Sequence, residues 1–446
     1  MSGIALALIK KGYSISGSDV IYNEQTNKMK ALGAQIFDSQ SKRNIDIILK
    51  KFPKKNIFIV KSSAISSENI EFQYCIKQKL PIRHRSEILS LIMKSYNSIA
   101  VAGTHGKTST STFLSTLLDK CTNNSSSIIG GIQPYYESNC HIKESKYLVA
   151  EIDESDGSNI IYKSNLGIIN NIDFDHCDYY SNLQDIIYTF KKFEANSSQL
   201  LANYDCKVTR EHINSDFNWS INEINDINFA LLPKHLTFNK SIAEYYENGV
   251  LYAELNIPIP GLHNLSNVAA AIAACRINNI SIHIIKQKLS FLKLPKKRFE
   301  FKGKLSERII IDDYAHHPNE INATLKLGRL FINSYKDQTK RLVAIFQPHR
   351  YSRVIKLAKE FGKELGQADL IILTEIFSAG EENTHNISSE IIANHIININ
   401  KNVIILKDNY ELKKVFFNLT KEGDFIINMG AGNCHELYNL LKDKFR

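Results

Sequence analysis

The sequence contains no apolar run close to the roughly 20 residues that a membrane-spanning helix needs. Its first residues also lack the charged start, apolar middle and small-residue cleavage site of a signal peptide. We therefore expect a cytoplasmic protein with no membrane partner.

Cysteine pairs with the spacing of a zinc or redox motif are absent as well. The cysteines are odd in number and widely spaced, and no two of them form Cys-x-x-Cys. We expect reduced thiols, as in a cytoplasm. Their positions are 75, 121, 140, 177, 206, 275 and 434.

Long basic segments are also missing, although the net charge is +9. Lysine and arginine are scattered, and pairs such as Lys50-Lys51 are brief. Because no basic groove with interleaved aromatics is evident, we expect no nucleic-acid partner. A mildly basic surface suits anionic small molecules equally well.

The length and composition are those of a multidomain globular enzyme. A chain of 446 residues exceeds what one hydrophobic core usually organises, so two or three domains are expected. Hydrophobic residues make up 43% and charged residues 23%, which is ordinary for such a protein.

The most informative stretch runs from 98 to 120. An apolar run, a glycine-bearing turn and a segment with Phe113, Leu114, Leu117 and Leu118 on one face predict a strand, a phosphate loop and an amphipathic helix. The alternative is an ordinary glycine-rich turn, since Val101 stands where the longer loop motif has glycine. The loop residues are Gly103, Thr104, His105, Gly106, Lys107, Thr108 and Ser109.

This loop has the chemistry of a nucleotide site. Gly103 and Gly106 let the backbone approach phosphate oxygens, and the following helix start favours negative charge. Lys107 adds a positive charge, and Thr108 offers a hydroxyl to Mg²⁺.

Two further apolar runs, after a polar stretch at 123–127, end in acids. The first, at 147–151, ends in Glu151, which is where a Mg²⁺ ligand is expected beside a phosphate loop. The second begins at Leu166 and leads into Asp173-Phe-Asp-His176. His176 is either a further metal ligand or a solvated loop residue.

The segment before the loop alternates helix and strand, which predicts doubly wound α/β structure. We expect a helix at 2–11 and strands at 13–19, 35–37, 57–62 and 80–82. The chain opens inside a helix, so we expect this sheet to lack one of its middle strands.

The segment after the loop region is first weakly and then strongly informative. Short extended pieces at 230–232, 236–238 and 249–255 predict antiparallel strands. Asn264 and Asn267 lie one turn apart before an alanine-rich helix at 268–276. They either face one nucleoside ligand or cap the helix.

The last third again alternates strand and helix, with polar motifs at the strand ends. Strands are expected at 308–311, 341–346, 370–373 and 403–406, a helix from Asn319, and a further apolar run from Phe425. Arg350 and Arg353 stand three apart directly after an apolar strand, so both could present guanidinium groups to one carboxylate or phosphate. The alternative is a solvated pair.

Taken together, these motifs resemble the Mur ligases over nearly the whole chain. Within that family, the segment from Gln347 to Arg353 favours members that add L-alanine. The motifs are Ala102-Gly-Thr-His-Gly-Lys-Thr108, Glu151-Ile-Asp-Glu-Ser-Asp156, Asn171-Ile-Asp-Phe-Asp-His176, Gly261-Leu-His-Asn-Leu-Ser-Asn267, Asp312-Asp-Tyr-Ala-His-His-Pro318, Gln347-Pro-His-Arg-Tyr-Ser-Arg353 and Met429-Gly-Ala-Gly-Asn433.

The resemblance implies three α/β domains. Residues 1–95 would form a Rossmann-like domain that binds UDP-N-acetylmuramate and lacks its first strand. Residues 96–295 would form a P-loop ATPase domain. Residues 296–446 would form a Rossmann-like domain that closes over the nucleotide and holds the amino acid.

It also implies a reaction and roles for residues. ATP would convert the muramoyl carboxylate to an acyl phosphate, and the amine of L-alanine would displace phosphate, with Mg²⁺ required. Lys107, His176, His316, Arg350 and Arg353 would be catalytic. The metal ligands would be Thr108, Glu151 and His176, and the nucleotide would be contacted by Asn264, Asn267, Arg298 and Asp313. Tyr314 and His316 would be further residues of the amino-acid site. The UDP-binding segment would contain Gly17, Ser18, Asp19, Ser62 and Ser63.

Three competing interpretations remain, with either a monomer or a homodimer as the assembly. One is a related ligase that attaches recycled tripeptide to the same sugar nucleotide, which Arg350, Arg353 and the Glu154-Ser-Asp156 segment disfavour. Another is a nucleotide-binding remnant that no longer ligates. A nucleic-acid-dependent NTPase is the most remote.

Overall fold

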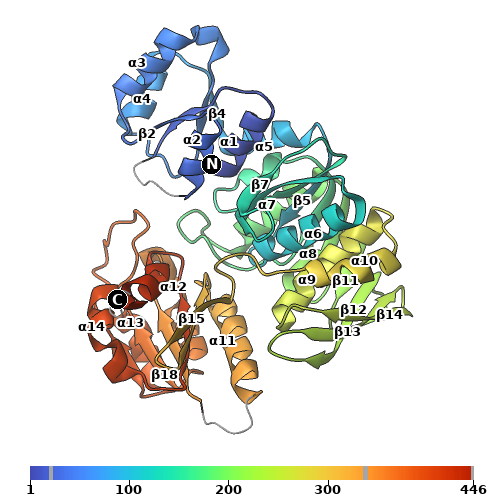
Figure 1. Ribbon diagram of the computed structural model, residues 1–446, viewed down its shortest axis with the longest axis vertical. Coiled ribbons are helices and arrows are strands. Elements are labelled where there is room, and N and C mark those ends of the chain that lie inside the picture. Colours follow the sequence, from blue (N-terminus) through green and yellow to red (C-terminus); the bar gives the residue numbers. More distant parts are fainter. Residues whose placement is uncertain (20–23, 335–339, 443–446) are drawn as a thin grey trace. The chain divides into compact units, whose positions relative to one another are not determined.

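The structure is a computed structural model that describes residues 1–19, 24–334 and 340–442. By packing, the chain divides into two compact units. Unit 1 comprises Met1–Ile172, Ile186–Trp219 and Ala270–Phe291, and unit 2 comprises Asp173–Asp185, Ser220–Ala269 and Leu292–Arg446. The elements of each are labelled in Figure 1.

Unit 1 begins with short helices and strands. The strands form two separate two-stranded parallel sheets, β1 with β2 and β3 with β4. The elements are α1 (Ser2–Lys10), β1 (Ser16–Ser18), α2 (Glu24–Ala31), β2 (Gln35–Phe37), α3 (Lys42–Lys51), β3 (Ile59–Lys61), α4 (Ile70–Lys77), β4 (Ile82–His84) and α5 (Arg85–Met93). The strand expected at 80–82 begins two residues later, at Ile82, because Leu80 and Pro81 belong to the connection that follows the turn after α4.

The rest of unit 1 is a mostly parallel sheet with strand order β11-β10-β9-β5-β8-β6-β7. All these pairs are parallel except β6 with β7. The elements are β5 (Asn97–Ala102), α6 (Lys107–Thr122), β6 (Ser125–Gln133), β7 (Ser138–His141), β8 (Tyr147–Glu151), β9 (Ser164–Ile169), α7 (Leu183–Ala195), β10 (Ser197–Asn203), α8 (Lys207–His212), β11 (Phe217–Ser220), α9 (Leu262–Ile277) and α10 (Ile282–Lys288).

Two features of this sheet differ from the sequence predictions. Helix α6 is not amphipathic, because every residue from Ser109 to Leu118 is buried, including serines and threonines whose hydroxyls can bond back to the helix, as Thr116 does to the Thr112 carbonyl. The polar residues 125–127 give no strand signal, yet they begin β6. Their hydroxyls find partners there, as when Ser127 donates to Gln133.

Unit 2 contains an antiparallel meander and the start of α9. The strands are β12 (Phe229–Leu236), β13 (Ser241–Glu247) and β14 (Val250–Ile257). The expected antiparallel character is confirmed, but the boundaries are not: the piece at 236–238 is the end of β12 and its turn, and β13 was not expected. Helix α9 begins at Leu262 rather than at 268, so Asn264 and Asn267 lie inside it.

The remainder of unit 2 is a six-stranded sheet with order β15-β16-β20-β17-β18-β19. Only β15, which was not expected, runs antiparallel to its neighbour. The elements are β15 (Glu300–Leu305), β16 (Arg308–Asp313), α11 (Pro318–Asn333), β17 (Leu342–Phe346), α12 (Tyr351–Leu365), β18 (Leu370–Leu373), α13 (Glu390–Ile397), β19 (Val403–Ile405), α14 (Asn409–Leu419), β20 (Phe425–Met429) and α15 (Leu437–Lys442).

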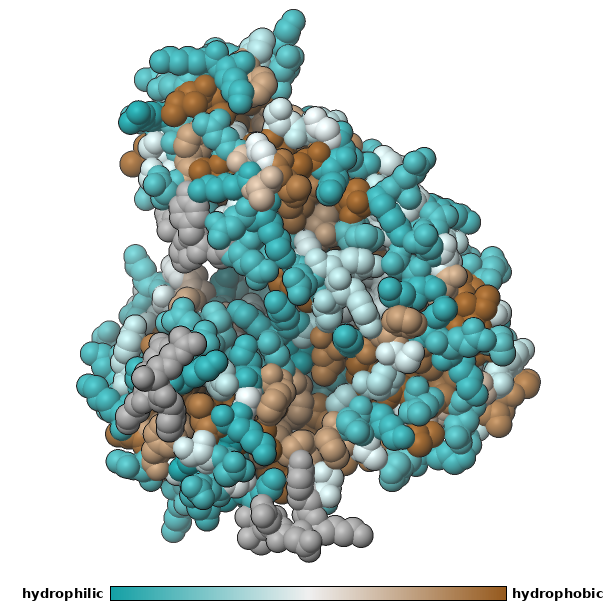
Figure 2. All heavy atoms as spheres, in the orientation of Figure 1, coloured by the Kyte–Doolittle hydropathy of each residue, from teal (hydrophilic) through white to brown (hydrophobic). Residues whose placement is uncertain are grey.

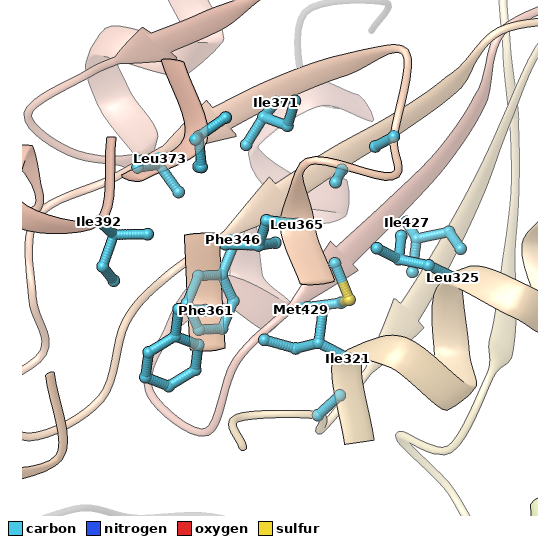
Figure 3. Packing of buried hydrophobic residues seen from close by; sticks show 14 of the residues in the cluster. Ile321, Leu325, Phe346, Phe361, Leu365, Ile371, Leu373, Ile392, Ile427 and Met429 are labelled. Atoms are coloured by element: carbon cyan, nitrogen blue, oxygen red, sulfur yellow. The ribbon is translucent and has the colours of Figure 1, made fainter. Parts of the chain in front are cut away.

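Alternate residues of these strands enter two apolar layers. Ile309, Ile311, Phe346 and Met429 pack with residues of α11, α12 and α13, while Ile310, Val343 and Ile345 pack with α14 and α15. Figure 3 shows the first layer, in which the rings of Phe346 and Phe361 lie 5.4 Å apart. The α/β fold with helices on both faces of the sheet is thus built by period-two alternation in nearly continuous apolar strands.

The face shown in Figure 2 is mainly polar, with apolar residues in separate small groups. Among the described residues, no helix is long and apolar enough to cross a membrane.

Candidate active site

The phosphate loop of unit 1 connects the buried strand β5 to the start of α6. Gly103 has φ +138° and Gly106 has φ +79°, both in the region that favours glycine. A Cβ on Gly103 would lie 2.9 Å from the Cβ of Asn170. The chain therefore needs glycine here for both conformation and space, and the free N–H groups at the start of α6 adjoin the loop.

Two asparagines that directly follow β9 hold this loop in shape. The side-chain oxygen of Asn171 accepts from the His105 N–H at 2.8 Å, and its carbonyl accepts from Thr104 N–H at 3.1 Å. The Asn170 amide donates to the Thr110 hydroxyl at 2.9 Å. Sequence reasoning missed this role, although two asparagines directly after a buried strand were a visible signal.

Lys107 lies against its own loop. Its ammonium donates to the carbonyls of Gly103 at 2.6 Å and Thr104 at 3.0 Å, and to Glu154 Oε1 at 2.9 Å. Burial by itself would lower the pKa of Lys107, but the carboxylates of Glu154 and Asp153 outweigh it and raise the pKa. The lysine therefore stays charged at neutral pH.

Thr108 and Glu151 form a pair of oxygen ligands beside this lysine. The Thr108 hydroxyl donates to Glu151 Oε1 at 2.9 Å, and the N–H of Gly130 donates to Oε2 at 2.6 Å. A Cβ on Gly130 would lie 2.7 Å from Glu151 Oε1, and one on Gly131 would lie 2.6 Å from Thr108 Cγ2. A hydroxyl and a carboxylate thus lie together, with glycine backbone packed directly against them. Both are hard oxygen ligands of the kind that Mg²⁺ prefers.

The acids at the end of β8 and directly after it contact two sets of partners in unit 1. Glu151 and Glu154 contact the phosphate-loop residues, whereas Asp153 and Asp156 contact Arg85 at 2.8 and 3.1 Å. The Arg85 guanidinium, together with Lys107, holds the pKa of Asp153 at about 2 although burial would raise it. Arg85 was not identified from the sequence, because only the fold brings the start of α5 to this loop.

In unit 2, Arg353 forms a buried ion pair with Asp175. Its Nε and Nη2 lie 2.9 and 2.8 Å from Asp175 Oδ1, and both side chains are only 3% exposed. Burial would raise the pKa of Asp175, but Arg353 and nearby histidines hold it well below its ordinary value. The carboxylate is therefore ionised across the physiological range.

Arg350 pairs with different carboxylates of the protein from Arg353. That both arginines bind one substrate carboxylate or phosphate stays a prediction. Its guanidinium donates to Asp178 and, at 3.4 Å, to Glu381. Arg350 has φ +71° and ψ +131°, a conformation that non-glycine residues rarely adopt. Arg350 is the N-cap residue of α12 whereas Arg353 lies inside the helix, and each pairs with a different acid.

Neutral histidines lie beside Arg353. Burial lowers the pKa of His316 to about 4 and that of His349 to about 3. His316 Nδ1 lies 2.9 Å from the Tyr314 carbonyl, which assigns the proton to Nδ1 and leaves Nε2 as an acceptor. The expected cluster of His316, Tyr314 and Arg353 is thus assembled in one unit.

The other expected nucleotide contacts also lie in unit 2. Asp313 accepts from the N–H groups of Phe299 and Ala315, both at 2.7 Å, and burial raises its pKa. Arg298 lies over the ring of Tyr314 and 3.7 Å from Glu320. Asn264 is buried inside α9 and donates to the Pro260 carbonyl at 3.0 Å, which is not the contact of an N-cap, whose side-chain oxygen accepts from a backbone N–H.

His176 lies in the loop after β9 and has φ +52°, so it too has left-handed backbone. The same loop holds Asp173, whose carboxylate is 4.0 Å from His317 Nδ1. In unit 1, residues of the expected UDP segment bond to acids: Ser18 donates to Glu71, and Ser63 to Asp156.

Unit 1 thus has the strand, glycine loop and helix of a P-loop nucleotide-binding enzyme, with a magnesium-type ligand pair beside the loop. Three family models match the chain in order: Mur ligase family, catalytic domain, at 1–97; Mur ligase middle domain at 101–275; and Mur ligase, glutamate ligase domain, at 297–432. The chain belongs to the Mur ligase family, whose three-domain α/β architecture it shares.

The similarity extends over complete chains. A protein of Prochlorococcus marinus subsp. pastoris named UDP-N-acetylmuramate--L-alanine ligase is 58% identical, covering 100% of this chain and 95% of its own length. One of the same name from another Prochlorococcus marinus strain is 44% identical, covering 100% and 96%.

Solved structures agree on the fold. The UDP-N-acetylmuramate-alanine ligase MurC of Thermotoga maritima superposes with a TM-score of 0.82 at 24% identity, covering 100% of this chain and 96% of that one. The murein peptide ligase of Psychrobacter arcticus gives 0.71 at 22% identity, covering 99% and 96%.

Proposed function

We propose that this protein is an ATP-dependent ligase that joins L-alanine to the muramoyl carboxylate of UDP-N-acetylmuramate, a step of peptidoglycan synthesis. The observation that carries the proposal is the 58% identity, over the whole chain, to a relative that bears this activity in its name. The phosphate loop with Lys107, Thr108 and Glu151 supplies the ATP-dependent half of that chemistry.

The reaction proceeds in two steps, formation of an acyl phosphate and displacement of phosphate by the amine. A carboxylate is a poor electrophile, so its oxygen first attacks the γ-phosphorus of ATP, which gives an acyl phosphate and ADP. The amine of L-alanine then attacks the acyl carbon, phosphate leaves and the nitrogen loses a proton. Both steps build negative charge on phosphoryl and acyl oxygens.

Residues of unit 1 stabilise that charge. The Lys107 ammonium and the N–H groups at the start of α6 attract phosphate oxygens. The lysine carries its positive charge because Glu154 and Asp153 raise its pKa. Thr108 and Glu151 of this unit, and His176 of unit 2, are the proposed ligands of Mg²⁺, which would neutralise phosphate charge when it is bound.

Residues of unit 2 hold the amino acid and the nucleotide base. Arg350 carries the positive charge for the alanine carboxylate, and neutral His316 offers Nε2 to the proton that the amine releases. Asn264, Asn267, Arg298 and Asp313 contact the nucleotide. Residues 1–95, 96–295 and 296–446 are the proposed domains for the sugar nucleotide, ATP and the amino acid.

The test is phosphate release from ATP and Mg²⁺ by the purified protein, with UDP-N-acetylmuramate and L-alanine each omitted in turn. We expect release only when both are present, together with a ligated product that mass spectrometry identifies. Release that needs a tripeptide instead of L-alanine would identify the recycling ligase. ATP binding without release under any condition would contradict the proposal and favour an inactive nucleotide-binding protein.

A further inference from the structure

The loop Asp173–Asp178, which carries His176, is attached to α12 and to the residue that precedes it. Three basic residues make the attachment: Arg350, the N-cap residue with non-helical backbone, and Arg353 and Lys356, which lie one turn apart inside the helix. They contact Asp178, Asp175 and the ring of Phe174, in that order. This reverse order means that the loop runs antiparallel to the helix, with one basic residue for each of three loop positions.

The start of α11 holds the same loop from another element. The Phe174 carbonyl lies 3.3 Å from His317 Nε2, and Asn319 donates to Asp173. The loop is thus fixed by side chains of two helices, and the geometry at His176 depends on them.

The two arginine pairs differ sharply in burial. Asp175 and Arg353 are 3% exposed, and the remaining Nη1 of Arg353 lies 3.2 Å from the His349 carbonyl. Asp178 and Arg350 are 35% and 30% exposed. A substrate carboxylate could replace Asp178 while solvent screens the separated charges, whereas replacing Asp175 would leave a buried carboxylate without its counter-ion.

Glu381 is a second acid that holds the Arg350 guanidinium during such an exchange. Its carboxylate accepts from the Ser352 N–H at 3.0 Å and from the Ser352 hydroxyl at 2.7 Å, and it lies 3.4 Å from Arg350. Glu381 is therefore fixed independently of Asp178. When Asp178 leaves, Arg350 still has an acid that keeps its guanidinium in place.

We propose that Asp178 is a resident carboxylate that occupies Arg350 until the carboxylate of the amino-acid substrate displaces it, while Asp175 is a positioning residue that is never displaced and fixes the loop of His176 through Arg353. This rests on the proposed ligase function. Asp178 thereby sets the affinity for the amino acid, and Asp175 sets the geometry of the metal-ligand loop.

The first test is steady-state kinetics of Asp178→Asn with saturating ATP and UDP-N-acetylmuramate. Removing the competing charge is expected to lower KM for L-alanine about 2–5-fold, the range for a half-exposed ion pair, with kcat changed less than KM. Asp178→Glu keeps the charge and should keep the wild-type KM. A raised KM in Asp178→Asn would overturn the proposal, since Asp178 would then assist amino-acid binding.

The second test is Asp175→Asn. We expect kcat to fall and the Mg²⁺ concentration for half-maximal rate to rise, with KM for L-alanine moving less, and with partial recovery in Asp175→Glu. Binding of Mn²⁺, followed by electron paramagnetic resonance, should weaken in parallel. If Asp175→Asn does not fold, the same two measurements on Arg353→Lys replace it.

The matched control is Asp424→Asn. Asp424 is also buried and lies 2.6 Å from Arg341 Nη2, but these two residues precede β20 and β17, at the strand ends opposite to the one that leads to Arg353. It should lower the melting temperature without changing KM or metal dependence. An Asp175→Asn variant that behaves like this control would reduce Asp175 to a structural role and overturn that half of the proposal. A wild-type protein without ligase turnover would instead contradict the proposed ligase function. In that case the effect of Asp178→Asn is measured on the binding of L-alanine, by thermal shift.

Discussion

At the scale of the residue, the site consists of charges whose state is set by neighbours. Lys107 remains an ammonium because two acids outweigh its burial, while His316 and His349 remain neutral because burial and nearby arginines disfavour their charged forms. The sequence identified Lys107 and His316 as chemical groups. It could not reveal their protonation, because Glu154 is 47 positions from Lys107 and Arg353 is 37 positions from His316.

Replacing Lys107 by Met removes the charge but keeps the length of the side chain. We expect kcat for phosphate release to fall about 10²–10³-fold, because the charge acts on phosphate oxygens in the transition state. The control is Lys143→Met, since Lys143 lies 2.5 Å from Asp119 Oδ1 and is also partly buried but follows β7 and is not part of the phosphate loop. Equal losses in the two variants would assign the effect to general destabilisation.

At the scale of the element, β6 shows how a strand can complete a site without contributing a side chain. Gly130 and Gly131 pass so close to Glu151 and Thr108 that any Cβ would collide with them. The pair Gly130-Gly131 is visible in the sequence, but its function is not, because the strand begins with serines and its partner β8 follows only after β7.

Gly131→Ala should therefore impair the Thr108 hydroxyl. The new Cβ would meet Thr108 Cγ2 at 2.6 Å, and such overpacking costs about 1–3 kcal/mol. We expect a raised Mg²⁺ requirement and a rate reduced about tenfold, corresponding to 1.4 kcal/mol of that range. Thr108→Ser removes Cγ2 and keeps the hydroxyl, so the double variant should recover activity; a double variant as impaired as Gly131→Ala would show that the collision is not the cause.

At the scale of the whole molecule, buried acids decide how stability responds to pH. Burial raises the pKa of Asp312 from 3.8 to about 6, although the Asn428 amide donates to it at 2.9 Å. At a pH between these two pKa values, Asp312 has lost its proton in the unfolded chain but keeps it in the folded chain. Asp312 therefore contributes stability below about pH 4 that is lost as the pH rises through about 6.

Asp312→Asn should remove this pH dependence. The free energy of unfolding of the variant at pH 7 should exceed that of the wild type by up to roughly 3 kcal/mol, the equivalent of the pKa difference. Asn428 Oδ1, which is buried and has no hydrogen-bond partner among the described residues, is available to the new amide. Denaturant unfolding at pH 4, 5.5 and 7 measures the free energy of unfolding of both proteins. If that free energy changes with pH equally in the two proteins, Asp312 does not cause the pH dependence.

The class of fold and the chemical groups of the site could be predicted from local patterns of residues. Continuous apolar runs such as 370–373 and 147–151 specify buried parallel strands, and glycine with lysine at 103–107 specifies a phosphate loop, because local backbone and charge requirements suffice. The meander boundaries, the burial of α6 on every face and the strand β15 depended on packing against distant segments.

The pairing of the charges, in contrast, depends on the folded chain. Arg350 and Arg353 are equivalent in the sequence, three residues apart, yet one meets a buried aspartate and the other a half-exposed one. Their partners lie more than 170 positions away. Pairing over such separations is set by where the chain returns in space, and no local pattern of residues encodes it.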